Sequence, residues 1–239
     1  MSVSFEGAEV VVIGGTSGIG LATATMLRDA GAHVTVVGRD KDRLAGALEQ
    51  LGNKASGATL DVADEAAVKE LFATFDHVDH VAMLAGTHAA GEIVDTDTST
   101  LQDPVSNRLW GALYVCKYAA PKMTDGSITI CTGAGVARPR RGAALVAAAA
   151  GGSEMLARAV ALEVAPVRVN IIRPGIVDTP LLERMSAGNR DAMVEAMAKR
   201  IPLRRVATPE DIADAIVFLM SNTYMTGSTL TIDGGFSLV

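Results

Sequence analysis

Cysteine is scarce in this sequence, which contains only Cys116 and Cys131 among its 239 residues. Neither stands in a spacing typical of metal ligation, and two cysteines cannot build the disulfide framework of a small secreted domain. We interpret both as small buried apolar residues in a reducing compartment. Histidine and carboxylate residues form no metal-ligating cluster along the chain, so we expect no metal site.

Excess positive charge is also absent, since the formal net charge is −6 and the pI is near 5.2. Proteins that bind nucleic acid or anionic membranes usually carry a basic face. No apolar run reaches the roughly 18 residues that a membrane span requires. Residues 1–7 are too short and polar for a secretion signal. We therefore expect no nucleic-acid or membrane partner, and a cytoplasmic location.

Hydrophobic residues are plentiful at 49%, and short β-branched runs alternate with helix-length stretches. The expected strands are 9–13, 33–37, 58–60, 80–84, 127–131, 168–172 and 229–232. The expected helices are 19–30, 42–51, 65–75, 101–123, 143–164 and 209–220. This alternation predicts one α/β Rossmann-type domain over residues 1–239, a doubly wound parallel sheet of about seven strands with helices on both faces. Residues 180–205 interrupt the alternation after a strand, which predicts a lid over a substrate site.

A glycine-rich turn joins the first expected strand to the first expected helix. It reads Gly14-Gly15-Thr16-Ser17-Gly18-Ile19-Gly20. Glycines let backbone amides approach a pyrophosphate closely, and the helix N-terminus adds partial positive charge there. The strand–turn–helix context makes this pattern much more specific than a lone glycine motif. It predicts a dinucleotide-binding site.

The end of the second expected strand reads Val37-Gly38-Arg39-Asp40. A carboxylate at the strand tip would bind a ribose 2′-hydroxyl, whereas Gly38 followed by Arg39 offers a guanidinium to a 2′-phosphate. We therefore expect NADP(H) to be favoured over NAD(H). The alternative is that Arg39 is an ordinary solvated loop residue.

These motifs, in this order, resemble the short-chain dehydrogenase/reductase family over essentially the whole chain. Ala85-Gly86 matches the end of the family's Asn-Asn-Ala-Gly motif, although Met83 and Leu84 replace both asparagines, and Ile13 stands where threonine is usual before the glycine turn. Further matches are Asp61, Arg168-Val169-Asn170, Pro174 to Pro180, Met225-Thr226-Gly227 and Asp233-Gly234-Gly235. The resemblance and the residue patterns together predict cofactor contacts at Gly14, Thr16, Ser17, Gly18, Ile19, Gly20, Arg39, Asp61, Val62, Ala85, Gly86, Pro174, Gly175, Ile176 and Thr179.

The family's chemistry uses a tyrosine as proton donor, a lysine one helical turn later that lowers the tyrosine pKa and binds ribose, a serine that orients the carbonyl, and a helix asparagine. In this sequence the resemblance places Val146 at the tyrosine position and Ala150 at the lysine position. Thr132 takes the serine position, and Asn107 falls at the asparagine position. Because Val146 and Ala150 cannot move a proton, ordinary carbonyl reduction is in doubt.

A literal Tyr-x-x-x-Lys does occur, at Tyr118 and Lys122, but it precedes the fifth expected strand. Cofactor contacts lie at the carboxyl ends of strands, so we exclude this pair as the catalytic one.

Other residues are candidates for substrate contacts. Arg138, Arg140 and Arg141 follow the fifth strand and would suit an anionic small molecule, or else form a solvated turn or a subunit salt bridge. His88 is the best-placed spare proton donor beyond Gly86, or else a surface-loop residue.

Three functions remain open from the sequence. The first is an NADP(H)-linked oxidoreductase acting on a carbonyl or alcohol, with its proton supplied by water, the substrate, the cofactor ribose or His88. The second is a non-catalytic dinucleotide-binding protein that acts as a sensor, scaffold or partner subunit. The third is a lyase or isomerase on the same fold. The apolar helices 101–123 and 143–164 match the family's subunit interface, which implies a homodimer or homotetramer, or they are simply core helices.

Overall fold

Seven parallel strands form a single sheet in the computed structural model, which describes residues 4–86, 91–186 and 188–239. The strands are β1 (Glu9–Ile13), β2 (His33–Gly38), β3 (Ala55–Thr59), β4 (His80–Met83), β5 (Ser127–Cys131), β6 (Arg168–Pro174) and β7 (Thr229–Ile232). Their order across the sheet is β3-β2-β1-β4-β5-β6-β7. The chain therefore reverses direction across the sheet between β1 and β4, where ligands bind in folds of this kind.

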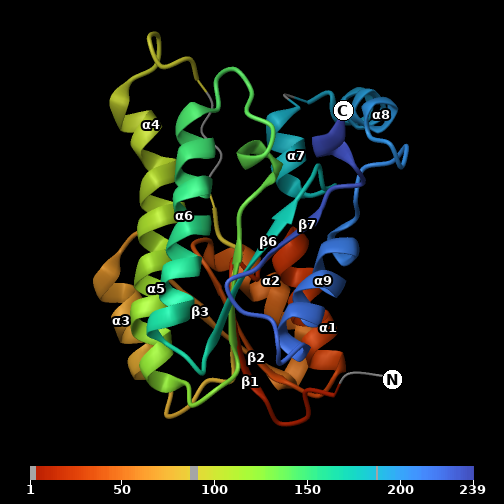
Figure 1. Cartoon of the computed structure of the whole chain (residues 1–239). Coiled ribbons are helices and arrows are strands. Elements are labelled where there is room, and N and C mark those ends of the chain that lie inside the picture. Colours follow the sequence, from red (N-terminus) through yellow and green to blue (C-terminus); the bar gives the residue numbers. More distant parts are fainter. Residues whose placement is uncertain (1–3, 87–90, 187) are drawn as a thin grey trace.

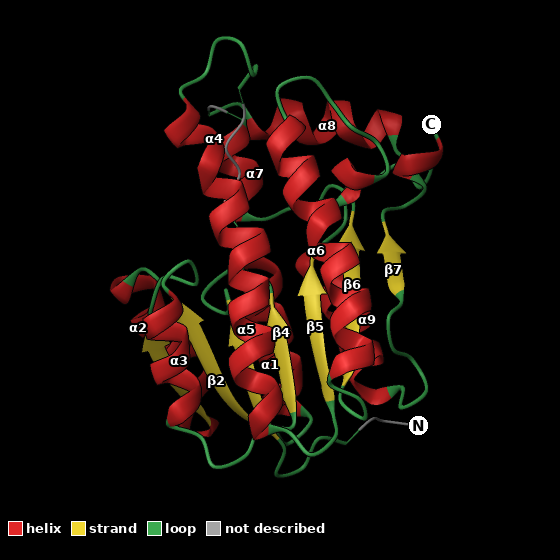
Figure 2. Ribbon diagram, turned by 60° about the vertical axis from the view of Figure 1, so that its left-hand side comes forward, coloured by secondary structure: helices red, strands yellow, loops and turns green. Residues whose placement is uncertain are grey.

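Helices cover both faces of the sheet (Figure 1). One face carries α3 (Glu65–Ala73), α5 (Gly111–Ala119) and α6 (Ala144–Glu163), and the other carries α1 (Gly18–Asp29), α2 (Lys41–Leu51) and α9 (Pro209–Ser221). Three short helices, α4 (Thr98–Pro104), α7 (Pro180–Met185) and α8 (Arg190–Arg200), lie beyond the carboxyl ends of the strands, at the top of Figure 2. The predicted doubly wound α/β fold is confirmed.

The side chains of β1 show how the sequence fills two cores. Val11 and Ile13 join the core beneath α3, α5 and α6, whereas Val10 and Val12 join the core beneath α1, α2 and α9. Successive residues of a strand point to opposite faces, so a strand covered on both faces must be apolar throughout.

Two elements differ from the sequence expectation. β3 begins at Ala55 rather than residue 58, because this edge strand is largely exposed and carries almost no apolar signal. The expected helix 101–123 is divided into α4, a π-helical segment (Val105–Trp110), α5 and a short 3₁₀ turn (Ala120–Lys122). Pro104 and Pro121 each lack a backbone N–H, and the first of them stands immediately before the π-helical segment.

α6 is the one described helix whose length and composition would allow a membrane crossing. It instead packs against β6 and the π-helical segment, with Ala149, Ala150, Ser153 and Ala157 buried. A long apolar core helix passes the same test of composition, and the packing identifies α6 as such a helix.

The two cysteines differ in burial, since Cys116 is buried as predicted and Cys131 is half-buried. Both carry free thiols, and burial raises the pKa of Cys116 to about 12 and that of Cys131 to about 11. Thiols with such pKa values are poor nucleophiles at neutral pH. Among the described residues, no group of three or more histidine, cysteine, aspartate or glutamate side chains is arranged to hold a metal ion.

Candidate functional site

A cleft of about 590 Å³ opens at the carboxyl edge of the sheet, above β1, β2 and β4. Its walls come from the glycine turn, the ends of β2 and β4, the π-helical segment and the start of α7. The lining residues are Ile13, Gly14, Thr16, Ser17, Gly18, Ile19, Gly20, Val37, Gly38, Arg39, Asp40, Arg43, Leu60, Val62, Leu84, Ala85, Gly86, Asn107, Thr179, Pro180, Leu181 and Arg184.

The glycine turn has no room for side chains at Gly14, Gly15 and Gly20. Gly14 has a φ of +87°, and a β-carbon there would lie 2.7 Å from the Ala85 nitrogen. A β-carbon on Gly20 would lie 2.0 Å from the Gly14 carbonyl oxygen. α1 begins at Gly18, and the Ser17 side chain makes no capping hydrogen bond. The amides of the first turn have no intrahelical acceptor, so they can donate to an anion in the cleft.

One end of the cleft combines a bare strand tip with two arginines. A β-carbon on Gly38 would lie 2.6 Å from Cγ2 of Thr16, so this backbone excludes a carboxylate side chain at the strand tip. Arg39 forms a half-exposed ion pair with Asp61 at 3.6 Å. Arg43, which the sequence analysis missed, also lines the cleft. Arg43 lies in the first turn of α2 after the N-cap residue Asp40, and no motif in the sequence marks this position as a cofactor contact.

The other end of the cleft is closed by the segment that follows β6. Thr179, Pro180, Leu181 and Arg184 line it, and Thr179 packs against Gly18. Pro174, Gly175 and Ile176 lie behind this wall and do not line the cleft. They position the segment, since a β-carbon on Gly175 would lie 2.7 Å from Cα of Asp233 at the end of β7.

Asp61 also stands back from the cleft lining. One of its carboxylate oxygens accepts from the Ala63 amide, and the other faces Arg39. Val62 beside it does line the cleft, as predicted.

Thr132, predicted at the carbonyl-orienting position, lies in a buried polar network. Its hydroxyl donates to Oε1 of Glu154 at 3.0 Å, and Glu154 binds Arg173 through contacts of 2.9 and 2.5 Å. Glu154 was not predicted as a functional residue, because its motif position resembles an ordinary helix residue. Since the Thr132 hydroxyl donates its proton to Glu154, it can act toward any further partner only as a hydrogen-bond acceptor.

α6 contains neither tyrosine nor lysine anywhere between Ala144 and Glu163. Val146 is half-buried in its first turn, and Ala150 is buried one turn later on the same face. Asn107 lies in the π-helical segment and lines the cleft, and its side-chain amide donates to the Asp103 carbonyl at 3.0 Å.

The three arginines that follow β5, Arg138, Arg140 and Arg141, make contacts within the protein. Arg138 donates to the Phe236 carbonyl at 3.0 Å and stacks over its ring, while Arg141 pairs with Glu92 at 2.7 Å. Arg140 also has an interaction partner. None of the three lines the cleft within the part of the chain that is described. His88 lies outside the described residues.

Tyr118 and Lys122 have separate hydrogen-bond partners on the face of the sheet that carries α3, α5 and α6. The Tyr118 hydroxyl donates to Glu65 at 2.8 Å, and the Lys122 ammonium donates to the Phe75 carbonyl at 2.7 Å. Neither lines the cleft, which agrees with their exclusion as a catalytic pair.

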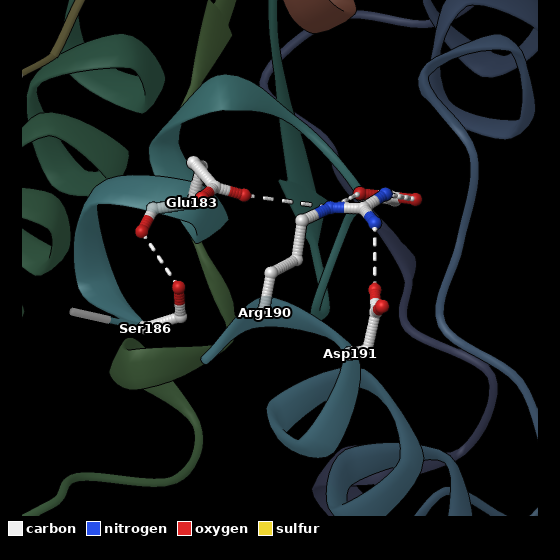
Figure 3. A network of polar contacts seen from close by, with 5 residues as sticks. Glu183, Ser186, Arg190 and Asp191 are labelled. Carbon is white, nitrogen blue, oxygen red and sulfur yellow. Dashed lines mark hydrogen bonds and ion pairs between the residues drawn. The ribbon is translucent and has the colours of Figure 1, made fainter. Parts of the chain in front are cut away.

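Arg190 connects the two helices of the segment 180–205. Its guanidinium lies between Glu183 of α7 and its neighbour Asp191 (Figure 3), at 3.8 and 3.2 Å. It also makes a double contact with Asp178, the residue that follows β6 shortly before α7, at 3.2 and 2.5 Å. These contacts hold the start of α8 against the wall of the cleft.

Comparison with known proteins gives a consistent family assignment. The family model described as "Enoyl-(Acyl carrier protein) reductase" matches residues 13–237. The chain is 32% identical to short-chain dehydrogenase/reductase ATR9 of Stachybotrys chlorohalonatus, covering 97% of this chain and 98% of the relative. It is also 32% identical to the human 3-oxoacyl-[acyl-carrier-protein] reductase, covering 95% and 97%.

Solved structures agree with this assignment. The MalC reductase/Diels-Alderase from Malbranchea aurantiaca superimposes with a TM-score of 0.92 at 28% identity, covering 98% of each chain. A small-chain dehydrogenase in complex with NADPH gives a TM-score of 0.82 at 31% identity, covering 98% of this chain and all of that one.

Proposed function

This chain belongs to the short-chain dehydrogenase/reductase family, and we propose that it binds NADP(H) and acts as an oxidoreductase on a carbonyl or alcohol substrate without the usual tyrosine–lysine pair. The observation that carries the proposal is the cleft above β1 and β4, whose glycine turn is too close-packed for side chains at Gly14 and Gly20 and leaves the amides at the start of α1 available to a pyrophosphate. Family membership supports a nicotinamide dinucleotide as the ligand.

The preference for NADP(H) follows from the Gly38 end of the cleft. Because Thr16 fills the space of a side chain at position 38, no carboxylate there can bind a 2′-hydroxyl or repel a 2′-phosphate. Arg39 and Arg43 line the same end, where Arg39 pairs with Asp61 at 3.6 Å and Arg43 with Asp40 at 3.4 Å, and a 2′-phosphate would draw these guanidinium groups from their carboxylates. A guanidinium binds a phosphate through paired charge-assisted hydrogen bonds, whereas a hydroxyl offers one neutral acceptor. A relative that was solved with NADPH supports the same choice.

Arg39→Ala is expected to weaken NADPH binding about 10-fold or more and NADH binding less than about 3-fold, since only NADPH carries the phosphate and one charge-assisted contact is worth roughly 1.5–3 kcal/mol. Isothermal titration calorimetry of both cofactors measures this difference. Lys54→Ala is the control, because Lys54 is an exposed cation that does not line the cleft. Equal weakening of both cofactors would contradict the NADP(H) preference, and an absence of affinity for either would contradict the proposed function.

The proton in such a reaction comes from a group other than the family tyrosine. Val146 and Ala150 offer no proton, and the Thr132 proton is directed toward Glu154. Water, the substrate, the cofactor ribose and His88 are the remaining donors.

A non-catalytic role is the second candidate. The absence of tyrosine and lysine from α6 favours a protein that binds the dinucleotide as a sensor, scaffold or partner subunit. Turnover of a broad carbonyl panel with NADPH distinguishes the two candidates, because a binding protein gives none while its calorimetric affinity remains.

We propose that the segment 180–205 acts as a lid over the substrate site. We also propose that the substrate is an anionic small molecule. Leu181 and Arg184 reach the cleft from α7, and Arg190 ties α8 to the same wall. Arg184 gives this end of the cleft a positive charge suited to a carboxylate or phosphate.

Arg190→Ala is expected to speed amide hydrogen exchange in α7 and α8 about 2- to 6-fold, because exposed ion pairs stabilise a segment only weakly. Hydrogen exchange followed by mass spectrometry measures this change. Lys199→Ala removes an exposed pair with Glu195 inside α8 and should leave α7 unchanged. Unchanged exchange in α7 after Arg190→Ala would show that Arg190 does not hold the lid.

Apolar side chains remain exposed on the outer surface of α6 and the adjacent π-helical segment. Trp110, Met155 and Leu162 are 49%, 63% and 84% exposed. We propose that this face forms the contact of a homodimer or homotetramer, as the family resemblance implies, since exposed apolar surface of this kind marks association sites.

A further inference from the structure

Arg108 places a guanidinium beside the wall of the cleft. A β-carbon built on Gly86 would lie 2.9 Å from Cζ of Arg108 and 3.1 Å from both terminal nitrogens. Gly86 itself lines the cleft, as does Asn107, the residue before Arg108. The missing side chain of Gly86 therefore makes the room in which this guanidinium lies.

The backbone of Arg108 lies within one helical turn of the position where the lysine is missing. Ser153 of α6 donates to the Arg108 carbonyl at 3.2 Å and to the Ala149 carbonyl at 2.8 Å. Ala150 is the next residue along α6 and is buried. The π-helical segment contributes to this arrangement, because one extra residue per turn changes the direction of the side chains that follow.

The Arg108 guanidinium lies against Gly86 in a partly desolvated position. Burial lowers its pKa, and the neighbouring Cys131 acts in the opposite direction. An arginine nevertheless stays protonated in proteins, so its charge remains inside the fold. A guanidinium has five N–H donors, enough to keep its contacts within the protein and bind one further group.

The length of a dinucleotide determines which part of the cofactor the Arg108 guanidinium could bind. With its adenosine phosphate at Arg39 and its pyrophosphate at the glycine turn, the remaining half must extend across Ala85 and Gly86 toward Asn107. On this basis, which rests on the proposed function, we propose that Arg108 binds the ribose hydroxyls of the nicotinamide half and supplies from the π-helical segment the cation that Ala150 no longer supplies from α6.

The test compares a whole cofactor with its adenosine half. Arg108→Met is expected to weaken NADPH about 10- to 100-fold by calorimetry while changing the affinity for 2′,5′-ADP less than about 2-fold. Arg108→Lys should recover part of the NADPH affinity, because it keeps the charge with fewer donors. Lys54→Met is the control for loss of a surface cation.

A second test moves the positive charge from position 108 to position 150 of α6. Adding Ala150→Lys to Arg108→Met should return the NADPH affinity to within about 3-fold of the unmodified protein, since the ammonium would then reach the ribose from α6. Failure of this lysine to improve binding would overturn the proposal. So would unchanged NADPH affinity in Arg108→Met, or equal weakening of NADPH and 2′,5′-ADP, which marks a merely structural arginine.

The two proposals fail in different ways. If the unmodified protein binds neither NADPH nor 2′,5′-ADP, the proposed function is wrong and this inference with it. If the unmodified protein binds NADPH and Arg108→Met binds it equally well, only the role of Arg108 is wrong.

Discussion

Arg168→Met is expected to lower the free energy of unfolding by about 3–5 kcal/mol, because several buried carbonyl acceptors lose their donor at a cost of roughly 1–3 kcal/mol each. Arg168 is the first residue of β6 and is only 8% exposed. Its guanidinium donates to the carbonyls of Leu219, Met220 and Asn222 at 2.7–2.9 Å, at the C-terminal end of α9. Methionine fills similar space but donates nothing.

Thermal and urea denaturation measure this loss. For a chain of this length, it corresponds to a fall of about 6–20 °C in Tm. Lys54→Met is the control, since it removes an exposed cation from the turn before β3 and should change Tm by no more than about 2 °C. A comparable stability of both variants would show that the carbonyls at the end of α9 are satisfied without Arg168.

Val146→Tyr combined with Ala150→Lys is expected to raise kcat/KM for carbonyl reduction with NADPH by about 10²- to 10⁴-fold, the usual contribution of a positioned acid–base group. The two positions lie one turn apart on the same face of α6, so the new phenol and ammonium would lie close enough to interact. The lysine lowers the pKa of the phenol from its ordinary value of about 10.

The matched control is Val146→Phe with Ala150→Met, which adds similar bulk without an ionisable group. Steady-state kinetics on a broad panel of ketones and aldehydes measures both pairs. If the unmodified protein already turns over substrates efficiently, and does so after Tyr118→Phe, a proton donor other than the tyrosine–lysine pair operates and the non-catalytic role is wrong.

The fold could be predicted closely from the sequence because its elements carry strong local signals. Apolar strands such as β1 are buried on both faces, and the glycine turn fixes the first strand–helix junction. β3 was placed three residues late because an exposed edge strand needs few apolar side chains. The divided helix at Pro104 was missed because the apolar pattern continues through the π-helical segment.

The site was only partly predictable. Motif matching found the cleft residues from Gly14 to Gly20, but not Arg43, Arg184 or Arg108, which reach the cleft or its wall through the path of the chain in space. Pairings between distant residues carry no sequence signal at all. The contact of Thr132 with Glu154 and that of Arg138 with Phe236 join residues 22 and 98 positions apart.

The close approach of Gly38 to Thr16 also constrains how the protein could be redesigned or could diverge. An aspartate introduced at position 38 to recruit NADH would overlap the threonine methyl group, so that substitution alone should damage the turn rather than switch the cofactor. Replacing Thr16 with glycine first would open the space. The two positions therefore form an epistatic pair in which the order of substitution decides whether the intermediate variant is functional.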